Sequence, residues 1–189
     1  MNESNRWNMK KLLYILAAVL LLASCEKDPF EEFLAKKSHS SAVHAIWDIA
    51  PLELAFEVTD RQGNNLFDES TPGNWLATPF LATFDGKEFR WPVSTPEVGT
   101  KAVLAVLKGF YINPQWWYPE SDVVYLRFGE LDRTEKWDTQ LRINWPDRSV
   151  DVIRIRNAFR WDEEGYPDYY TEIKVNGKPV EGPVIRLAK

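Results

Sequence analysis

From residue 42 onward, apolar side chains recur at every second position. Residues 52–59 read LELAFEVT, and a similar alternation runs through residues 140–145 (QLRINW) and 153–156 (IRIR). Successive side chains of a strand point to opposite faces of a sheet, so this period predicts strands with one buried and one solvated face. A chain patterned in this way favours sheets over a helical bundle.

Other segments add to the predicted strands. Residues 102–107 (AVLAVL) are continuously apolar, which predicts a central strand covered on both faces, and residues 123–128 form another predicted strand. Weaker strand patterns occupy residues 79–84, 87–91, 169–175 and 183–188.

Turn signals separate these strands. Asp85-Gly86 and Asn176-Gly177 are two-residue hairpin signatures, because both dipeptides tolerate a positive φ. Longer turns are predicted at residues 61–65, 145–149 and 162–165. Frequent turns without alternating helices predict an all-β domain over residues 42–189. We expect an antiparallel β-sandwich, either immunoglobulin-like or an open-barrel variant.

A short helix is predicted before this domain. Asp28 is placed to cap it, Pro29 suits its first position, and apolar residues recur at helical spacing. We expect the helix over residues 29–37, within a tether that spans residues 25–41.

The first 24 residues are predicted to be a signal peptide. Arg6, Lys10 and Lys11 give a basic region, and eleven uncharged residues, LLYILAAVLLL, follow it. At about 1.5 Å per residue, a helix of this length is too short for a hydrocarbon core of about 30 Å. The order of basic region, apolar region and small residues is typical of a secretory signal peptide over residues 1–24.

The end of this segment, Leu22-Ala23-Ser24-Cys25, resembles the lipobox of bacterial lipoproteins. The lipobox, the short tether and a predicted β-sandwich with turn segments at residues 63–65 (GNN) and 145–147 (WPD) together resemble Bacteroidetes-type lipoproteins of unknown function. The lipobox is the specific part of this resemblance and covers about the first 25 residues, and the remainder is a general likeness. The resemblance implies a diacylglyceryl group on the Cys25 thiol, cleavage before Cys25, and acylation of the new amino terminus by a fatty acid such as palmitate. Two acyl chains give stable membrane anchoring. An ordinary signal peptide followed by a chance cysteine is the alternative.

The residues after Cys25 bear on location. Glu26 stands where the inner-membrane retention signal of enteric lipoproteins has aspartate, so that signal is absent. Lys27-Asp28 partly resembles the export tag of surface lipoproteins in Bacteroidetes-type bacteria, although Pro29 interrupts it. We therefore expect an outer-membrane lipoprotein, on either the cell surface or the periplasmic face.

Composition argues against several function classes. The 189 residues carry a net charge of −5, and loss of residues 1–24 removes three basic residues and one acidic residue, which leaves −7. A nucleic-acid binder needs a basic face, so no nucleic-acid partner is expected. A single cysteine provides neither a disulfide framework nor a cysteine-based zinc site.

No catalytic residue, metal site or cofactor is predicted. The chain has no G-x-S-x-G motif and no phosphate-binding glycine loop, and the spacing of its two histidines, His39 and His44, suits neither a helical nor a strand ligand pair. Residues 60–68 fit a calcium loop poorly, so a turn is expected there. The strand arginines are expected to pair with acidic neighbours and not to form an anion site: Arg127, Arg142, Arg154, Arg156 and Arg160.

Aromatic loops are the candidates for ligand binding. Trp116, Trp117 and Tyr118 lie in a predicted loop over residues 113–120, and Tyr169 follows another turn. Exposed rings can stack on a sugar or contact a protein, whereas buried rings would close the end of the sandwich. We expect a membrane-anchored, non-enzymatic binding or structural module of the cell envelope, with a protein or envelope component as its partner. A glycan-binding lipoprotein is the first alternative, and a hydrolase with paired carboxylates is the second.

Overall fold

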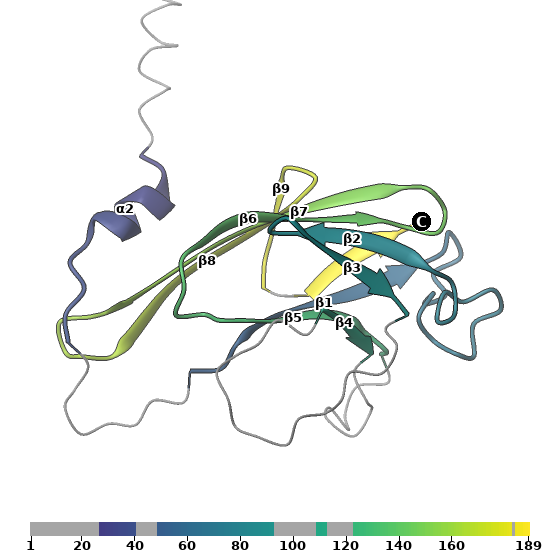
Figure 1. Ribbon diagram of the computed structural model, residues 1–189, viewed down its shortest axis with the longest axis horizontal. Helices are drawn as coiled ribbons and strands as arrows, with labels where there is room; N and C mark the ends of the chain where they lie inside the picture. Colours follow the sequence, from purple (N-terminus) through teal and green to yellow (C-terminus); the bar gives the residue numbers. More distant parts are fainter. Residues whose placement is uncertain (1–26, 41–48, 93–108, 113–122, 183) are drawn as a thin grey trace, which may run out of the picture. The chain divides into compact units, whose positions relative to one another are not determined.

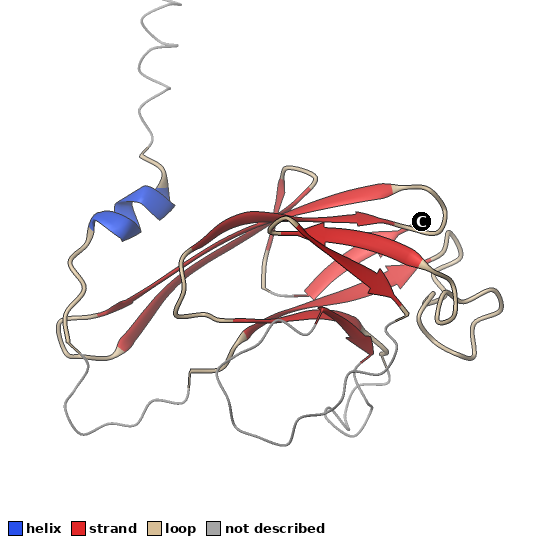
Figure 2. Cartoon of the chain, viewed as in Figure 1, coloured by secondary structure: helices blue, strands red, loops and turns tan. Residues whose placement is uncertain are grey.

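The computed structural model describes residues 27–40, 49–92, 109–112, 123–182 and 184–189. The chain divides into two compact units, Met1–Lys36 and Lys37–Lys189. The described part of the first unit holds the helix α2 (Pro29–Ala35), and the described part of the second is built from β-strands (Figure 2). Cys25, the strand predicted at 102–107 and the loop at 113–120 lie outside the described residues.

The helix α2 forms where the sequence predicts it. The Asp28 carboxylate accepts a hydrogen bond of 3.1 Å from the N–H of Phe30, and Pro29 lies in the first turn. A capping carboxylate satisfies a backbone donor that has no partner within the helix. The helix ends at Ala35, short of the expected limit at residue 37, because Lys36 adopts an extended backbone.

The larger sheet has the strand order β3-β2-β6-β7-β8-β9 among the described residues, with antiparallel neighbours throughout (Figure 1). The predicted alternation is confirmed, because Leu141 and Ile143 are fully buried while Gln140 and Arg142 are exposed. The strands are β2 (Phe80–Phe84), β3 (Lys87–Trp91), β6 (Trp137–Asn144), β7 (Val150–Trp161), β8 (Pro167–Val175) and β9 (Lys178–Val180).

The smaller sheet has the order β10-β1-β5-β4 within the described part of the chain. The strand β1 is antiparallel to β5 but parallel to β10, a pairing that the sequence pattern does not predict. The strand predicted at 123–128 instead begins at Leu126, where strand pairing with Phe56 of β1 and Ile112 of β4 starts. The strands are β1 (Leu52–Thr59), β4 (Gly109–Ile112), β5 (Leu126–Leu131) and β10 (Val184–Ala188).

Both predicted two-residue hairpins are confirmed. Asp85 and Gly86 have φ of 48° and 72°, and Asn176 and Gly177 have φ of 51° and 81°. Two successive positive φ angles define the turn whose twist matches that of the flanking strands. The first turn sets β2 against β3, and the second sets β8 against β9.

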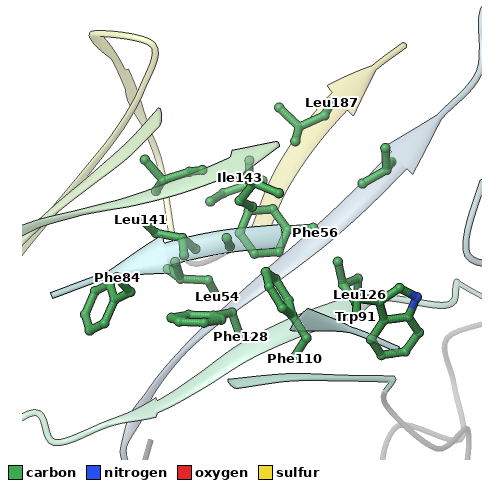
Figure 3. Packing of buried hydrophobic residues seen from close by; sticks show 14 of the residues in the cluster. Leu54, Phe56, Phe84, Trp91, Phe110, Leu126, Phe128, Leu141, Ile143 and Leu187 are labelled. Carbon is green, nitrogen blue, oxygen red and sulfur yellow. The ribbon is translucent and has the colours of Figure 1, made fainter. Parts of the chain in front are cut away.

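The core lies between the two sheets and is rich in phenylalanine. The ring of Phe128 in β5 lies 5.4 Å from Phe84 of β2 and 5.2 Å from Phe89 of β3, measured between centroids. It also lies 5.0 Å from Phe110 in the neighbouring strand β4. Figure 3 shows the rings of Phe84, Phe110 and Phe128 between the strands. Such packing joins the inner faces of the sheets, which confirms the expected all-β sandwich.

Replacing Phe128 by alanine should lower the free energy of unfolding by about 3–5 kcal/mol, because it removes a ring with no exposed surface and leaves a cavity. Urea unfolding followed by tryptophan fluorescence measures the loss. Val150→Ala, at a side chain that is 38% exposed, is the control and should cost much less. Equal losses in the two variants would contradict the placement of the core.

Candidate functional site

The strands β7 and β8 continue past β6 and form a hairpin that projects from the larger sheet. Pairing between β6 and β7 stops at Trp137 and Asn157, whereas β7 and β8 stay paired as far as Trp161 and Pro167 (Figure 1). We call residues 158–170, which lie beyond this point, the projecting hairpin.

The turn of the projecting hairpin is held by one carboxylate. Asp162 accepts hydrogen bonds of 3.0 Å from the N–H of Glu164 and 2.7 Å from the N–H of Tyr166. Gly165 has a φ of 82°, which glycine adopts without strain. This confirms the loop predicted at residues 162–165 and leaves Tyr166 with 55% of its surface exposed.

Three aromatic residues share one face of the projecting hairpin. Phe159 and Trp161 alternate along β7, and Tyr169 lies opposite Phe159 in β8. The Phe159 ring centroid is 5.0 Å from that of Trp161 and 5.6 Å from that of Tyr169. The Arg133 guanidinium carbon lies 5.3 Å from the Tyr169 ring centroid, within reach of a cation–π contact. The three rings, each half-buried, form the aromatic cluster of this hairpin.

Of the residues predicted for ligand binding, the structure describes Tyr169 and places it in this aromatic cluster. Trp116, Trp117 and Tyr118 lie outside the described residues. The sequence analysis missed Phe159 and Trp161. The signal was present in the sequence, because both continue the alternation that begins at Ile153 and Ile155.

Most of the strand arginines form ion pairs with acidic side chains. Arg156 is only 6% exposed and lies between two carboxylates, with atom separations of 3.6 Å to Asp138 and 3.7 Å to Glu172. The expected pairing with acidic neighbours is confirmed for Arg156 and for three more arginines, in the pairs Arg127–Glu53, Arg154–Asp138 and Arg160–Asp168. The remaining arginine, Arg142, is exposed.

A buried polar cluster lies at the other end of β7. Asp151 is 6% exposed and accepts hydrogen bonds of 2.7 Å from the indole N–H of Trp145 and the side-chain amide of Asn176. It also forms an ion pair with the Lys189 ammonium, which in turn donates to the Ser149 hydroxyl at 3.0 Å. The ion pair joins the two sheets, because Asp151 belongs to β7 and Lys189 follows β10.

This cluster holds a serine and a lysine in contact, which is one arrangement used for nucleophilic catalysis. The Lys189 side chain is also paired with the Asp151 carboxylate and lies 5.1 Å from the Trp145 ring centroid. These contacts connect the end of the chain to β7 and thereby stabilise the fold.

The environment of Asp151 sets its protonation. Burial acts to raise the pKa of the carboxyl group, but hydrogen bonds from Lys189, Asn176 and Trp145 prevail and hold the pKa below its ordinary value. The carboxylate is thus ionised at neutral pH, and the ion pair between the sheets is fully formed.

The turn after β1 is held by Asp60, whose side chain accepts three hydrogen bonds of 2.8 Å, one from the N–H of Gln62 and two from Asn64. These bonds, first among them the one from the Asn64 side chain, lower the pKa of Asp60. The turn expected at residues 61–65 is thereby confirmed, and a carboxylate occupied in this way stabilises the loop from within.

A shallow depression near the start of β2 is mainly apolar and is lined by Pro79, Phe80, Leu81, Arg90, Trp91 and Pro92. Its charged side chain, Arg90, is exposed to solvent and faces Glu88 at 3.8 Å. It lacks the convergent polar groups that fix the orientation of a small ligand.

Comparison with known proteins finds no matching family model, no matching curated protein and no matching solved structure. Across the described ranges, no three His, Cys, Asp or Glu side chains come together as a metal site requires. No helix in the described part of the chain has the length and apolar character needed to cross a membrane.

Replacing Asp151 by alanine should lower the free energy of unfolding at pH 7 by about 3 kcal/mol, because it leaves the buried Lys189 ammonium without its carboxylate. The pKa of Asp151 is lowered by folding, so its stabilisation is present above its unfolded value of about 3.9 and is lost as the pH falls through the folded value. Urea midpoints of wild type and variant should therefore converge in strong acid.

Glu69→Gln provides the control, because Glu69 is an exposed carboxylate outside the polar cluster. Its urea midpoint should follow that of the wild type at every pH. An Asp151→Ala variant that behaves like this control at pH 7 would show that the ion pair does not stabilise the sandwich.

Proposed function

We propose that this chain is a lipid-anchored, non-enzymatic binding module of the bacterial cell envelope, held at the outer membrane by acyl chains on Cys25. The observation that carries the proposal is the lipobox-like sequence Leu22-Ala23-Ser24-Cys25, which directly follows a basic and then an apolar segment. A thioether-linked diacylglyceryl group with a further amide-linked acyl chain would hold the domain at a bilayer without a membrane-spanning helix.

The distribution of charged groups supports a binding role over an enzymatic one. Among the described residues, the buried charged side chains of Asp151, Lys189 and Arg156 form ion pairs that join strands or sheets. Groups used in this way stabilise the fold and are not free to transfer protons to a substrate. Partly exposed aromatic side chains are accessible to a binding partner, and aromatic rings are enriched at protein interfaces.

A protein or another envelope component is the partner we favour. A glycan ligand is the second candidate, and the gathering of Phe159, Trp161 and Tyr169 on one face of the projecting hairpin favours it. The Arg133 guanidinium lies over the Tyr169 ring, so a sugar would have to stack on the other face of this ring or displace that guanidinium.

Cys25→Ser should release the protein from membranes into the soluble fraction, because the variant offers no thiol for the lipid. Fractionation in high salt, which weakens electrostatic association, measures the change. Intact-mass analysis of the wild type should show a chain that begins at Cys25 and carries added hydrocarbon mass. A variant that stays with the membranes in high salt, or a wild type that keeps Met1, would refute the anchor.

A glycan array separates the two candidate ligands. With a protein partner, the wild-type domain should bind array sugars no better than a Trp116→Ala, Trp117→Ala double variant does. With a glycan ligand, the wild type should bind selected sugars, and the double variant or Tyr169→Ala should lose that binding. Tyr125→Ala, at a half-buried tyrosine outside the aromatic cluster, is the matched control.

A further inference from the structure

Within the second unit, Lys37–Lys189, the first residues of the unit bond to the projecting hairpin. The N–H of His39 donates to the backbone oxygen of Trp161 at 3.0 Å, and the N–H of Trp161 donates to the Ser38 hydroxyl at 3.1 Å. The Arg160 guanidinium reaches the backbone oxygen of Lys37 at 3.5 Å. Residues 37–39 therefore form hydrogen bonds with the part of β7 that is not paired with β6. We call these bonds the tether contact.

The tether contact lies at one end of the sandwich, which we call the tether end. The first strand of the domain also starts there, because Leu52 pairs with Leu131 at the close of β5. The turn that follows β5 is fixed to the same region of β7, since the Asn157 side chain donates to the backbone oxygens of Arg133 and Glu135 at 2.9 and 2.8 Å.

The opposite end, which we call the far end, gathers a different set of turns. Lys189 donates its backbone N–H to Thr59 at the close of β1, and its ammonium contacts Ser149 and Asp151 near the start of β7. Asn176 of the β8–β9 turn also reaches Asp151. The strand β7 runs from Val150 at the far end to Trp161 at the tether end, a span of roughly 37 Å at about 3.4 Å per residue.

The chain between the lipid site and the tether contact is short. Twelve residue steps separate Cys25 from Lys37, and even a fully extended chain of that length spans only about 40 Å. Seven of these residues form α2, whose rise of about 1.5 Å per residue lowers the limit to roughly 28 Å. A lipid on Cys25 therefore keeps the tether end near the bilayer. The far end can lie farther from the bilayer than the tether end by as much as the length of β7.

From this arrangement we propose that the projecting hairpin faces the lipid headgroup layer and that the far end points away from the membrane. The proposal rests on the lipid anchor proposed for Cys25. It assigns the headgroup layer as the surface next to residues 158–170.

The side chains of the projecting hairpin suit a position beside headgroups. Tyr166 is exposed at the turn, and Trp161 and Tyr169 are half-buried behind it. Tyrosine and tryptophan are enriched at membrane–water interfaces, where one part of the ring is apolar and another is hydrated. Glu163 and Glu164 are exposed at the same turn, and their charges keep the hairpin at the interface and out of the hydrocarbon.

Energy transfer to the membrane tests the orientation directly. Cys25 is the only cysteine of the chain, so in the lipidated protein a single introduced cysteine takes a fluorescent donor. We would place the donor at Glu163→Cys on the projecting hairpin or at Val150→Cys at the far end, both exposed positions. The protein is then bound to phosphatidylcholine vesicles that contain an acceptor-labelled lipid.

The expected result is severalfold more efficient transfer from position 163 than from position 150. Equal transfer from the two positions, or more from position 150, would overturn the proposed orientation. The same donors in a Cys25→Ser background should show no transfer, because that protein stays in solution. If the lipidated chain itself fails to bind vesicles, the lipid anchor fails, and if it binds without the contrast, only the orientation fails.

Discussion

Contact between apolar rings of the two sheets is the interaction on which the rest of the structure depends. Phe128 meets Phe84 and Phe89 from the opposite sheet, and Phe56 meets Trp145 at 6.3 Å between centroids. Edge-to-face contacts of this kind fix the spacing of the sheets as well as burying apolar surface. Two sheets held face to face leave their outer faces and their two ends for other functions.

Polar groups complete the packing where apolar contact stops. At the far end, Asp151 and Lys189 join the sheets through a buried ion pair that also takes in Trp145 and Asn176. On the outer face of the larger sheet, Arg156 lies between two carboxylates of neighbouring strands. Breaking a buried pair costs more than its formation contributes, so these contacts specify how strands and sheets align.

The two ends of the sandwich differ in ways that matter for the proposed orientation at the membrane. The tether end combines the projecting hairpin, its aromatic cluster and the hydrogen bonds from residues 37–39. The far end combines tight turns with a buried ion pair. A lipid attached through a short tether would orient the domain, with the tether end toward the membrane and the far end away from it.

Local rules account for what the sequence predicts correctly. The alternation in residues 52–59 identifies β1 and its buried face, and Asp85-Gly86 and Asn176-Gly177 locate two hairpins, because side-chain period and positive φ are properties of neighbouring residues. The same reasoning places Asp28 at the start of α2. The lipobox prediction also comes from sequence alone, and it concerns residues outside the described part of the chain.

Tertiary structure decides what depends on partners distant in the chain. The parallel pairing of β1 with β10, the start of β5 at Leu126 and the short strand β9 are set by which strands lie alongside, and no local pattern records that. The same holds for the candidate site. The aromatic pattern predicts Tyr169 as a candidate, but only the register of β7 and β8 brings it beside Phe159. Likewise, Ser38 and His39 bond to β7 only where its pairing with β6 has ended. Sequence determines which side chains can be buried or can turn the chain, whereas the pairing of distant strands determines which of them meet.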